Sequence, residues 1–341
     1  MYIYGAGQDA RDVIHQCENA DVRVLGVLDD NPERAGEEFE GHKIQSTDSA
    51  GNPGPSTPFV ITTHRVTPAA ERLVKAGITS FFPAWALQIL SPDRFQPHMY
   101  YADWAEDLVA NKDKYIALWE LFSDAESRRV YRAFMEFKVR FDPLVLADIV
   151  DVPGEYFPEG VLELTDHEIL IDGGAWTGDT INVFKEKTGD TFRKVYAFEP
   201  SAGTFEKLTE NFSDDDRVVP VNKGLYEIST VLKFDDLGSS ASRFGDKGTF
   251  EVPVTSIDET VGDDAVSLIK MNIEGAEAAA LRGGAKTIRR NHPKLAICLY
   301  HNPRDLWEIP AVIQEISPAY DFHIRLHDGG VIQLVAYAIP K

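Results

Sequence analysis

Apolar runs and helix-like segments alternate along most of this 341-residue chain, and glycine-containing turns separate them. The clearest unit spans residues 168–200. One apolar run ends there in Asp172, the loop DGGAWTG follows, a helix-like segment begins near Asp179, and a second apolar run ends in Glu199. Apolar strands that alternate with amphipathic segments are typical of a parallel sheet covered by helices. The pattern therefore predicts an α/β fold organised around this strand, loop, helix and strand.

The same alternation continues toward the C-terminus. Further strands and helices are predicted, in chain order, at 202–211 (helix), 218–221 (strand), 266–271 (strand), 276–288 (helix), 295–300 (strand) and 312–316 (helix). The final segment, YDFHIRLHDGGVIQLVAYAIP, predicts an antiparallel hairpin that closes a mostly parallel sheet. Residues 224–254 are predicted as two strands joined by a polar loop, DDLGSSASRFGDKG, for which a lid, adenine contacts and a flexible linker all stay open.

Residues 1–88 repeat this unit in a second form. A short apolar strand leads into the turn GAGQDA, which contains Gly5 and Gly7, and a helix and a second strand follow, ending at Asp29 and Asp30. A glycine turn and acids in these places suit a nucleotide, although GxGxxA alone is a weak signal. GVLDDNPERAG resembles the nucleotide-sugar-binding N-terminal domain of bacterial sugar O-acetyltransferases. We interpret this smaller Rossmann-like domain either as a site for a nucleotide or nucleotide-sugar, or as a relative without ligand that serves docking or dimerisation.

Residues 89–150 are predicted to form a helical connector. Apolar positions recur there at helical spacing, as in YIALWELF and VYRAFMEFKVRF. The aromatic residues among them are expected to pack against one another rather than to bind a ligand. A polar stretch through DVPG ends the connector, which places a second α/β domain at 151–341.

The formal net charge of −21 narrows the choice of partners. A strongly negative field repels phosphate, so neither nucleic acid nor an anionic membrane is expected as a partner. Cys17 and Cys298 are predicted to be buried thiols rather than a disulfide framework. The chain shows no signal-peptide pattern and no apolar run of membrane-spanning length, so a cytoplasmic location is expected. A homo-oligomer stays open.

The central loop contains the candidate cofactor site. Gly173, Gly174 and Gly178 allow close backbone approach and positive φ angles where the strand enters the helix. Asp172 would repel a pyrophosphate and suits a cationic ligand. S-adenosylmethionine fits, since it carries a sulfonium and an amino group and no phosphate. Glu199, roughly 20 residues beyond the last loop glycine, has the position of an acid that accepts hydrogen bonds from a ribose diol.

Four motifs together resemble those of FkbM-family methyltransferases, over residues 150–340. They are EILIDGGAWTGDT, VYAFEP, LIKMNIEGAEAAAL and LYHNPRDLWEIP. The resemblance implies a Rossmann-like class I domain that uses S-adenosylmethionine to methylate a hydroxyl of a sugar, glycan or secondary metabolite. It also implies that Asp172, Gly174 and Gly178 approach the methionine end of the cofactor and Glu199 its ribose. The family's usual KxDxEG motif has Asn272 in place of the acid, which removes the most obvious metal-binding carboxylate, and no metal site is predicted.

The predicted fourth strand brings Lys270, Asn272 and Glu274 to the edge of the sheet where ligands bind. His301, after the fifth strand, is the first candidate for the general base, with acceptor binding or helix capping as alternatives. Glu274 is a second candidate base or a partner of the cofactor amine. Asn272 would orient the cofactor amine or the acceptor, and Lys270 would pair with a carboxylate or activate the nucleophile. Two other functions stay open: a catalytically silent nucleotide-sugar or cofactor-binding protein, and a dehydrogenase that uses GAGQDA.

Overall fold

The computed structural model describes residues 1–49, 54, 56–96, 100–235, 243–244, 250–330 and 332–341. The chain divides into two compact units. The first contains Met1–Ala110, Arg128–Val152 and Leu326–Gln333, and the second contains Asn111–Ser127, Pro153–Arg325 and Leu334–Lys341. The segment 89–150, which the sequence predicts as one connector, is therefore shared between the two units.

A mainly parallel sheet forms the first unit, and its strands lie in the order β3-β4-β2-β1-β5-β6. Their bounds are β1 (Tyr2–Tyr4), β2 (Gly26–Leu28), β3 (Glu38–Phe39), β4 (His42–Gln45), β5 (Phe59–Ile61) and β6 (Phe81–Pro83). All pairs are parallel except β3 with β4. The predicted strands at the start of the chain are present, but the pair β3 and β4 was not foreseen, because these short strands carry mostly polar residues.

The helices of the first unit pack their apolar faces into its core. They are α1 (Gln8–Asn19), α2 (Val66–Lys75), α3 (Trp85–Leu90), α4 (Trp104–Ala110) and most of α6 (Ala125–Arg140). Ile14 and Cys17 of α1 pack with Val27 and Val60 of the sheet. Most aromatic residues of the segment 89–150 are buried, as predicted, whereas Trp119 is 39% exposed.

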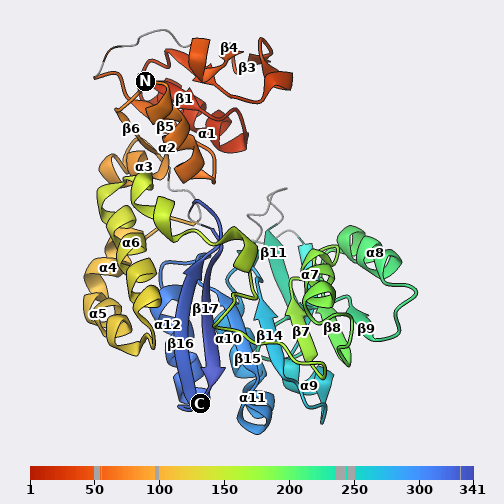
Figure 1. Cartoon of the computed structure of the whole chain (residues 1–341). Helices are drawn as coiled ribbons and strands as arrows, with labels where there is room; N and C mark the ends of the chain where they lie inside the picture. Colours follow the sequence, from red (N-terminus) through yellow and green to blue (C-terminus); the bar gives the residue numbers. More distant parts are fainter. Residues whose placement is uncertain (50–53, 55, 97–99, 236–242, 245–249, 331) are drawn as a thin grey trace. The chain divides into compact units, whose positions relative to one another are not determined.

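The second unit contains the larger sheet, with strand order β16-β17-β15-β14-β7-β8-β9, which Figure 1 shows from left to right. The strands are β7 (Ile169–Gly173), β8 (Lys194–Phe198), β9 (Val218–Val221), β14 (Leu268–Met271), β15 (Lys294–Cys298), β16 (Tyr320–Leu326) and β17 (Leu334–Pro340). From β15 to β9 the pairs are parallel, and β17 runs antiparallel to β15. This confirms the predicted Rossmann-like α/β architecture and the closing strands at its C-terminus.

The helices of the second unit follow the predicted alternation in part, since the helix at Ile257–Val261 was not predicted and the helix predicted at 312–316 begins at Asp305. They are α5 (Lys112–Leu121), α7 (Asp179–Lys187), α8 (Ala202–Asn211), α9 (Ile257–Val261), α10 (Glu277–Gly283), α11 (Ala285–Asn291) and α12 (Asp305–Ile316). The single helix predicted at 276–288 is wrong, since α10 and α11 are separate. A Cβ atom at Gly283 would lie 2.3 Å from the carbonyl oxygen of Tyr226, so the chain at this break passes too close for a larger residue.

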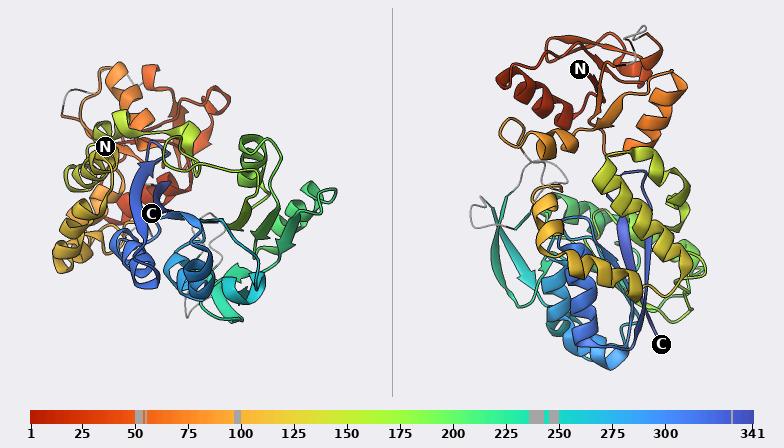
Figure 2. Two further views of the ribbon diagram at one scale, coloured as in Figure 1. Left: turned by 60° about the horizontal axis from the view of Figure 1, so that its bottom comes forward. Right: turned by 90° about the vertical axis from the view of Figure 1, so that its left-hand side faces the viewer.

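A smaller sheet lies in the insertion between β9 and β14. Its strands, in the order β10-β13-β11-β12, are β10 (Gly224–Leu225), β13 (Phe250–Thr255), β11 (Thr230–Asp235) and β12 (Arg243–Phe244), and Figure 2 shows the longer two in teal. The two strands predicted within 224–254 are therefore present. Most of the polar loop DDLGSSASRFGDKG, predicted as a lid, a source of adenine contacts or a linker, lies outside the described residues.

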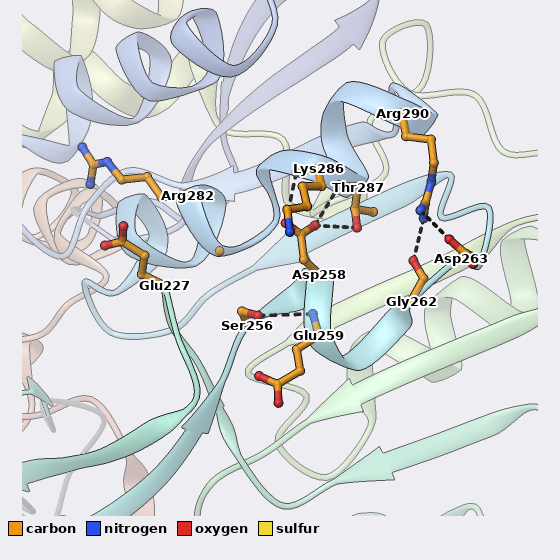
Figure 3. Close-up of a pocket in the computed structure, with 11 residues that line it drawn as sticks. Glu227, Ser256, Asp258, Glu259, Gly262, Asp263, Arg282, Lys286, Thr287 and Arg290 are labelled. Carbon is orange, nitrogen blue, oxygen red and sulfur yellow. Dashed lines mark hydrogen bonds and ion pairs between the residues drawn. The ribbon is translucent and has the colours of Figure 1, made fainter.

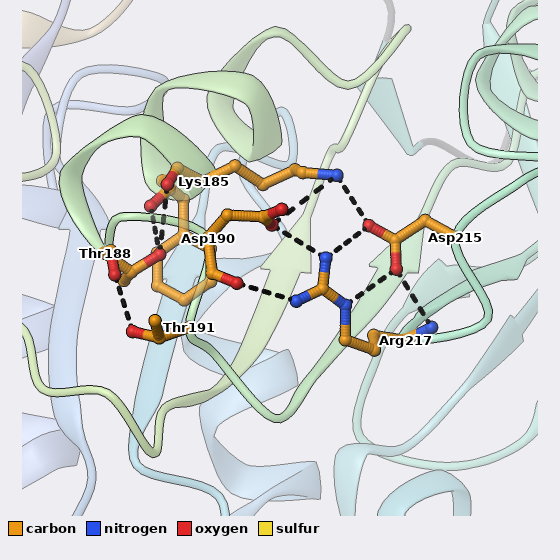
Figure 4. Close-up of polar contacts among 7 residues, drawn as sticks. Lys185, Thr188, Asp190, Thr191, Asp215 and Arg217 are labelled. Carbon is orange, nitrogen blue, oxygen red and sulfur yellow. Dashed lines mark hydrogen bonds and ion pairs between the residues drawn. The ribbon is translucent and has the colours of Figure 1, made fainter.

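An ion-pair network joins the end of α7 to the start of β9, as Figure 4 shows. Asp215 lies between Lys185, at 2.5 Å from its Nζ, and Arg217, at 2.8 Å from its Nε. Arg217 also reaches Asp190 at 2.7 Å. These cations hold the pKa of the Asp215 carboxyl well below its usual range. The network lies at the end of the sheet opposite the glycine loop. It therefore stabilises that end of the sheet and does not shape the loop.

Candidate functional site

A buried ion pair lies where β7 and β14 end. Asp172 and Lys270 are direct neighbours in the register of these parallel strands. The Nζ of Lys270 donates to Asp172 Oδ1 at 2.8 Å and to the Gly174 carbonyl at 3.0 Å. Burial raises the pKa of the Asp172 carboxyl, and the Lys270 charge opposes that shift. Asp172 Oδ2 is buried and has no hydrogen-bond partner among the described residues, so this oxygen is available to a ligand.

The glycine loop after β7 is shaped by the protein as well as by any ligand. Gly174 has φ +71°, and a Cβ there would lie 2.1 Å from the carbonyl oxygen of Asn272. At Gly178, with φ +93°, a Cβ would lie 2.0 Å from the ring of Phe212. Gly173 is the last residue of β7 and packs against Leu225 and Met271. From the sequence, these glycines were expected to make room for a ligand. In the structure, neighbouring protein atoms also leave no room for a larger residue.

Glu199 closes the other side of this loop. Its Oε2 accepts the Trp176 backbone N–H at 3.1 Å and its Oε1 accepts the Ser201 N–H at 2.9 Å. Burial raises the pKa of this carboxyl, and the two backbone donors oppose that shift. Each carboxylate oxygen can accept a second hydrogen bond, so Glu199 can still receive a ribose hydroxyl.

Asn272 lies in a chain of hydroxyl groups that the sequence did not indicate. Its Nδ2 donates to the Tyr156 hydroxyl at 3.1 Å, and its Oδ1 accepts from the Tyr300 hydroxyl at 2.9 Å. Tyr156 also places its ring 4.9 Å from the Nζ of Lys270. No pattern marked Tyr156, because it lies in an irregular segment before β7. Tyr300 could have been predicted near the site, because it directly precedes His301, the predicted base.

His301 lies beyond the end of β15 rather than at its tip, and it is buried among carboxylates. Its Nδ1 is 3.0 Å from Glu277 Oε1, and its Nε2 is 3.7 Å from Glu274 Oε2. Burial alone would lower the pKa of His301, but the charges of Glu277 and Glu274 outweigh it and raise that pKa to about 9. Burial and the charge of Glu277 raise the pKa of Asp305 to about 7. The imidazole therefore carries a proton at neutral pH, and its role as a base stays a prediction.

The residues at this edge fit S-adenosylmethionine. A cationic ligand group suits the buried, open Oδ2 of Asp172, and a diol suits the remaining acceptor capacity of Glu199. The chemistry of these groups agrees with the cofactor that the sequence predicted.

The glycine turn of the first unit is organised differently. Asp29 Oδ2 accepts the Ala6 backbone N–H at 3.0 Å, inside the turn itself. Asp30 accepts from the Thr47 N–H at 2.8 Å and from Arg72 Nε at 2.9 Å. These hydrogen bonds and the Arg72 charge lower the pKa of Asp30 against the effect of its burial. Both acids predicted to bind a nucleotide are thus engaged by the chain itself, and nucleotide binding at Gly5, Gly7, Asp29 and Asp30 stays a prediction.

A surface pocket of about 490 Å³ lies elsewhere in the second unit, between α9, α10 and α11. Figure 3 shows that acids face its cations. Asp258 accepts the backbone N–H groups of Lys286 and Thr287 at the start of α11, and Arg290 pairs with Asp263 at 3.1 Å. The acid already occupies the helix terminus that would attract an anion, so this pocket is a weaker candidate than the glycine loop.

Comparison with known proteins assigns the second unit. Residues 172–325 match the family model described as "Methyltransferase FkbM domain". The chain carries an FkbM methyltransferase domain. The crystal structure of a methyltransferase FkbM from Methylobacillus flagellatus has the same fold, with a TM-score of 0.80 and 22% identity, over 99% of this chain and 89% of that one. The fold match thus extends beyond the FkbM domain to the first unit.

A related protein is named for its sugar substrate. The hexuronic acid methyltransferase AglP of Haloferax volcanii is 29% identical over 131 residues, which cover 36% of this chain and 52% of that protein. The chain therefore spans about half the length of this relative. Within the described residues of the chain, no helix has the length and apolar character needed to cross a membrane.

Proposed function

We propose that this protein uses S-adenosylmethionine to methylate a hydroxyl group of a sugar or glycan. The FkbM domain supports methyl transfer, and the hexuronic acid methyltransferase among its relatives supports a sugar acceptor. The observation that carries the cofactor is the buried Asp172 Oδ2, which lies at the end of β7 beside a backbone that only glycine can form. A buried carboxylate oxygen without a partner is costly unless a ligand donates to it.

The residues at the edge of the sheet have different roles. Asp172 and Glu199 bind and orient the cofactor, and Lys270 pairs with Asp172 Oδ1 and opposes the rise of its pKa caused by burial. When bound, S-adenosylmethionine supplies a methyl group activated by its sulfonium. Asn272 is held between Tyr156 and Tyr300, which fixes its amide for contact with the cofactor amine or the acceptor.

Among the catalytic candidates, Glu274 is the better placed to reach an acceptor. Its side chain is 28% exposed, compared with 3% for His301. Glu274 is also held at φ +57°, a backbone conformation that residues other than glycine rarely adopt and that is often kept at functional sites. We infer that Glu274 accepts the proton of the acceptor hydroxyl, and that His301 positions Glu274 through its Nε2.

The test is calorimetric titration of the full chain with S-adenosylhomocysteine. We expect micromolar binding that weakens about 10- to 100-fold in Asp172→Asn and in Glu199→Gln, as for the loss of one charge-assisted hydrogen bond. Asp29→Asn, at the other glycine turn, is the matched control and keeps wild-type affinity. A folded wild type without binding would overturn the proposal.

The acceptor class is tested separately. Incubation with S-adenosylmethionine and oligosaccharides that contain hexuronic acid should add one methyl group, detected by mass spectrometry. Glu274→Gln should lower kcat by about 10²-fold or more while leaving affinity for S-adenosylhomocysteine unchanged. Cofactor binding without methylation of any sugar acceptor would instead favour a catalytically silent binding protein.

A further inference from the structure

Three buried side chains of metal-ligating type meet at one point of the second unit. Glu277 begins α10, His301 follows β15 and Asp305 begins α12, so three separate elements contribute to the cluster. One ligating atom from each lies within 4.8 Å of the others. Two ligand atoms bound about 2.1 Å from one ion lie at most about 4.2 Å apart, so ion binding would draw these atoms slightly closer together. The elements therefore bring a nitrogen and carboxylate oxygens close to ion-binding spacing without any sequence motif.

The cluster buries two carboxyl groups beside a single imidazole. Glu277 is fully buried and Asp305 is 3% exposed. Among the described residues, neither of these two carboxylates forms an ion pair with a lysine or arginine. Buried carboxylates of this kind cost several kcal/mol each unless a cation compensates them. A proton on His301 compensates one charge, and a divalent cation would compensate two.

A second observation points to a ligand. Glu277 Oε1 accepts the Ile273 backbone N–H at 2.8 Å, whereas Oε2 is buried and accepts no hydrogen bond from any described residue. Asp305 is oriented in a similar way, because its Oδ2 accepts the Asn302 N–H at 2.7 Å. Such backbone donors fix the carboxylates that bind a metal. Glu277 thus places Oε1 at 3.0 Å from His301 Nδ1, while its Oε2 is buried with nothing in the described chain to bind.

We propose that Glu277, His301 and Asp305 bind one divalent first-row transition-metal cation, with Mn²⁺ as the probe. One imidazole nitrogen with carboxylate oxygens suits ions of the Mn²⁺ to Zn²⁺ series better than Ca²⁺ or Mg²⁺. Binding replaces the proton on His301, and that proton passes to solvent. Three protein ligands would leave positions on the ion for solvent. The site goes beyond the proposed methyl transfer and does not depend on it.

The experiment measures metal binding by the full chain, without cofactor or acceptor. Chelator-treated protein is titrated with Mn²⁺, and free Mn²⁺ is followed by its paramagnetic resonance signal. We expect one Mn²⁺ per chain, and pulsed spectra that show coupling to one imidazole nitrogen. Glu277→Gln and Asp305→Asn should weaken binding by at least about tenfold, the loss caused even by removing an outer partner of a ligand. Glu315→Gln, an exposed acid on the same helix as Asp305, should bind like the wild type.

Three results would overturn the site. They are a folded wild type that binds no Mn²⁺, bound Mn²⁺ without nitrogen coupling, and folded Glu277→Gln and Asp305→Asn variants that bind like the wild type. Circular dichroism shows whether the variants are folded. If neither folds, the wild-type spectrum still decides, because a surface site made of carboxylates gives no nitrogen coupling. Failure here leaves the binding of S-adenosylhomocysteine untouched, so the two proposals fail separately.

Discussion

The two units use the same strand, glycine turn and helix, yet only the strand before the FkbM turn brings an acid to it. In the FkbM domain, Asp172 directs one oxygen to Lys270 and keeps the other buried without a partner among the described residues. In the first unit, Asp29 turns back onto the Ala6 N–H, inside its own glycine turn. Glu199 accepts the Trp176 N–H in the same way, so the difference lies at the first strand of each unit: β7 carries Asp172 at its end, and β1 ends in Tyr4.

The glycines of the two turns also differ in how much space surrounds them. A side chain at Gly174 would collide with the backbone of Asn272, while a side chain at Gly7 meets nothing within 4 Å. The FkbM turn is thus packed tightly against the neighbouring strand end, whereas the first turn is open at Gly7 and less tightly packed at Gly5, where a Cβ would lie 3.3 Å from Thr62 Oγ1. A glycine pattern in a sequence shows that a close turn is allowed, but the structure decides what approaches it.

The largest expected effect comes from exchanging these glycines for alanine. Gly174→Ala places a Cβ 2.1 Å from a backbone oxygen and forces a positive φ on alanine, so we expect a loss of more than about 4 kcal/mol of unfolding free energy. Gly7→Ala, at φ −97°, should remain within about 1 kcal/mol of the wild type. Urea denaturation measures both. Equal effects at the two positions would remove the difference between the turns.

The parallel strands of the FkbM domain and the acids at their ends could be predicted from the sequence. β7 is a continuous run of buried residues, as expected for a strand covered on both faces, and its end identified Asp172 directly. The neighbouring position of Lys270 followed from strand order alone. Glycines and acids at strand ends are local features, so a sequence displays them.

The cluster around His301 was beyond sequence reasoning. Glu277 and Asp305 lie at the starts of two helices that are distant in the chain, and each could have been an ordinary solvated acid of a first helical turn. His301 was predicted at a strand tip, but β15 ends earlier and the side chain turns into the protein. Such contacts depend on how helices pack, which no spacing in the sequence specifies.

A second prediction compares the acids of the two turns by stability. Asp172→Asn leaves the Lys270 ammonium buried without its countercharge, so we expect a loss of about 3–5 kcal/mol. Asp29→Asn removes a partly exposed carboxylate and keeps an oxygen for the Ala6 N–H, so the loss should be about 1 kcal/mol or less. Chemical denaturation at pH 7 tests this pair. A larger loss in Asp29→Asn would show that the first turn depends on its charge.

The smallest expected effect concerns Lys138, a lysine of the first unit that is buried like Lys270 of the second. Lys138 is 6% exposed and lies over the rings of Tyr101 at 4.5 Å and Trp85 at 5.0 Å. No carboxylate of the described residues pairs with Lys138, and burial lowers its pKa from 10.5 to about 7. Between these values the unfolded chain binds a proton that the folded chain lacks, so stability rises with pH across this window.

Lys138→Met should remove this slope, which is at most about 1.4 kcal/mol per pH unit. The measurement is the unfolding free energy of wild type and variant from pH 7 to pH 10. Lys114→Met, which removes an exposed ammonium at 3.3 Å from the Trp307 ring, is the control and should keep the wild-type slope. An unchanged slope in Lys138→Met would mean that the aromatic rings hold the charged form as firmly as water does. The first unit would then retain a buried charge by ring faces alone, where the FkbM domain uses a carboxylate.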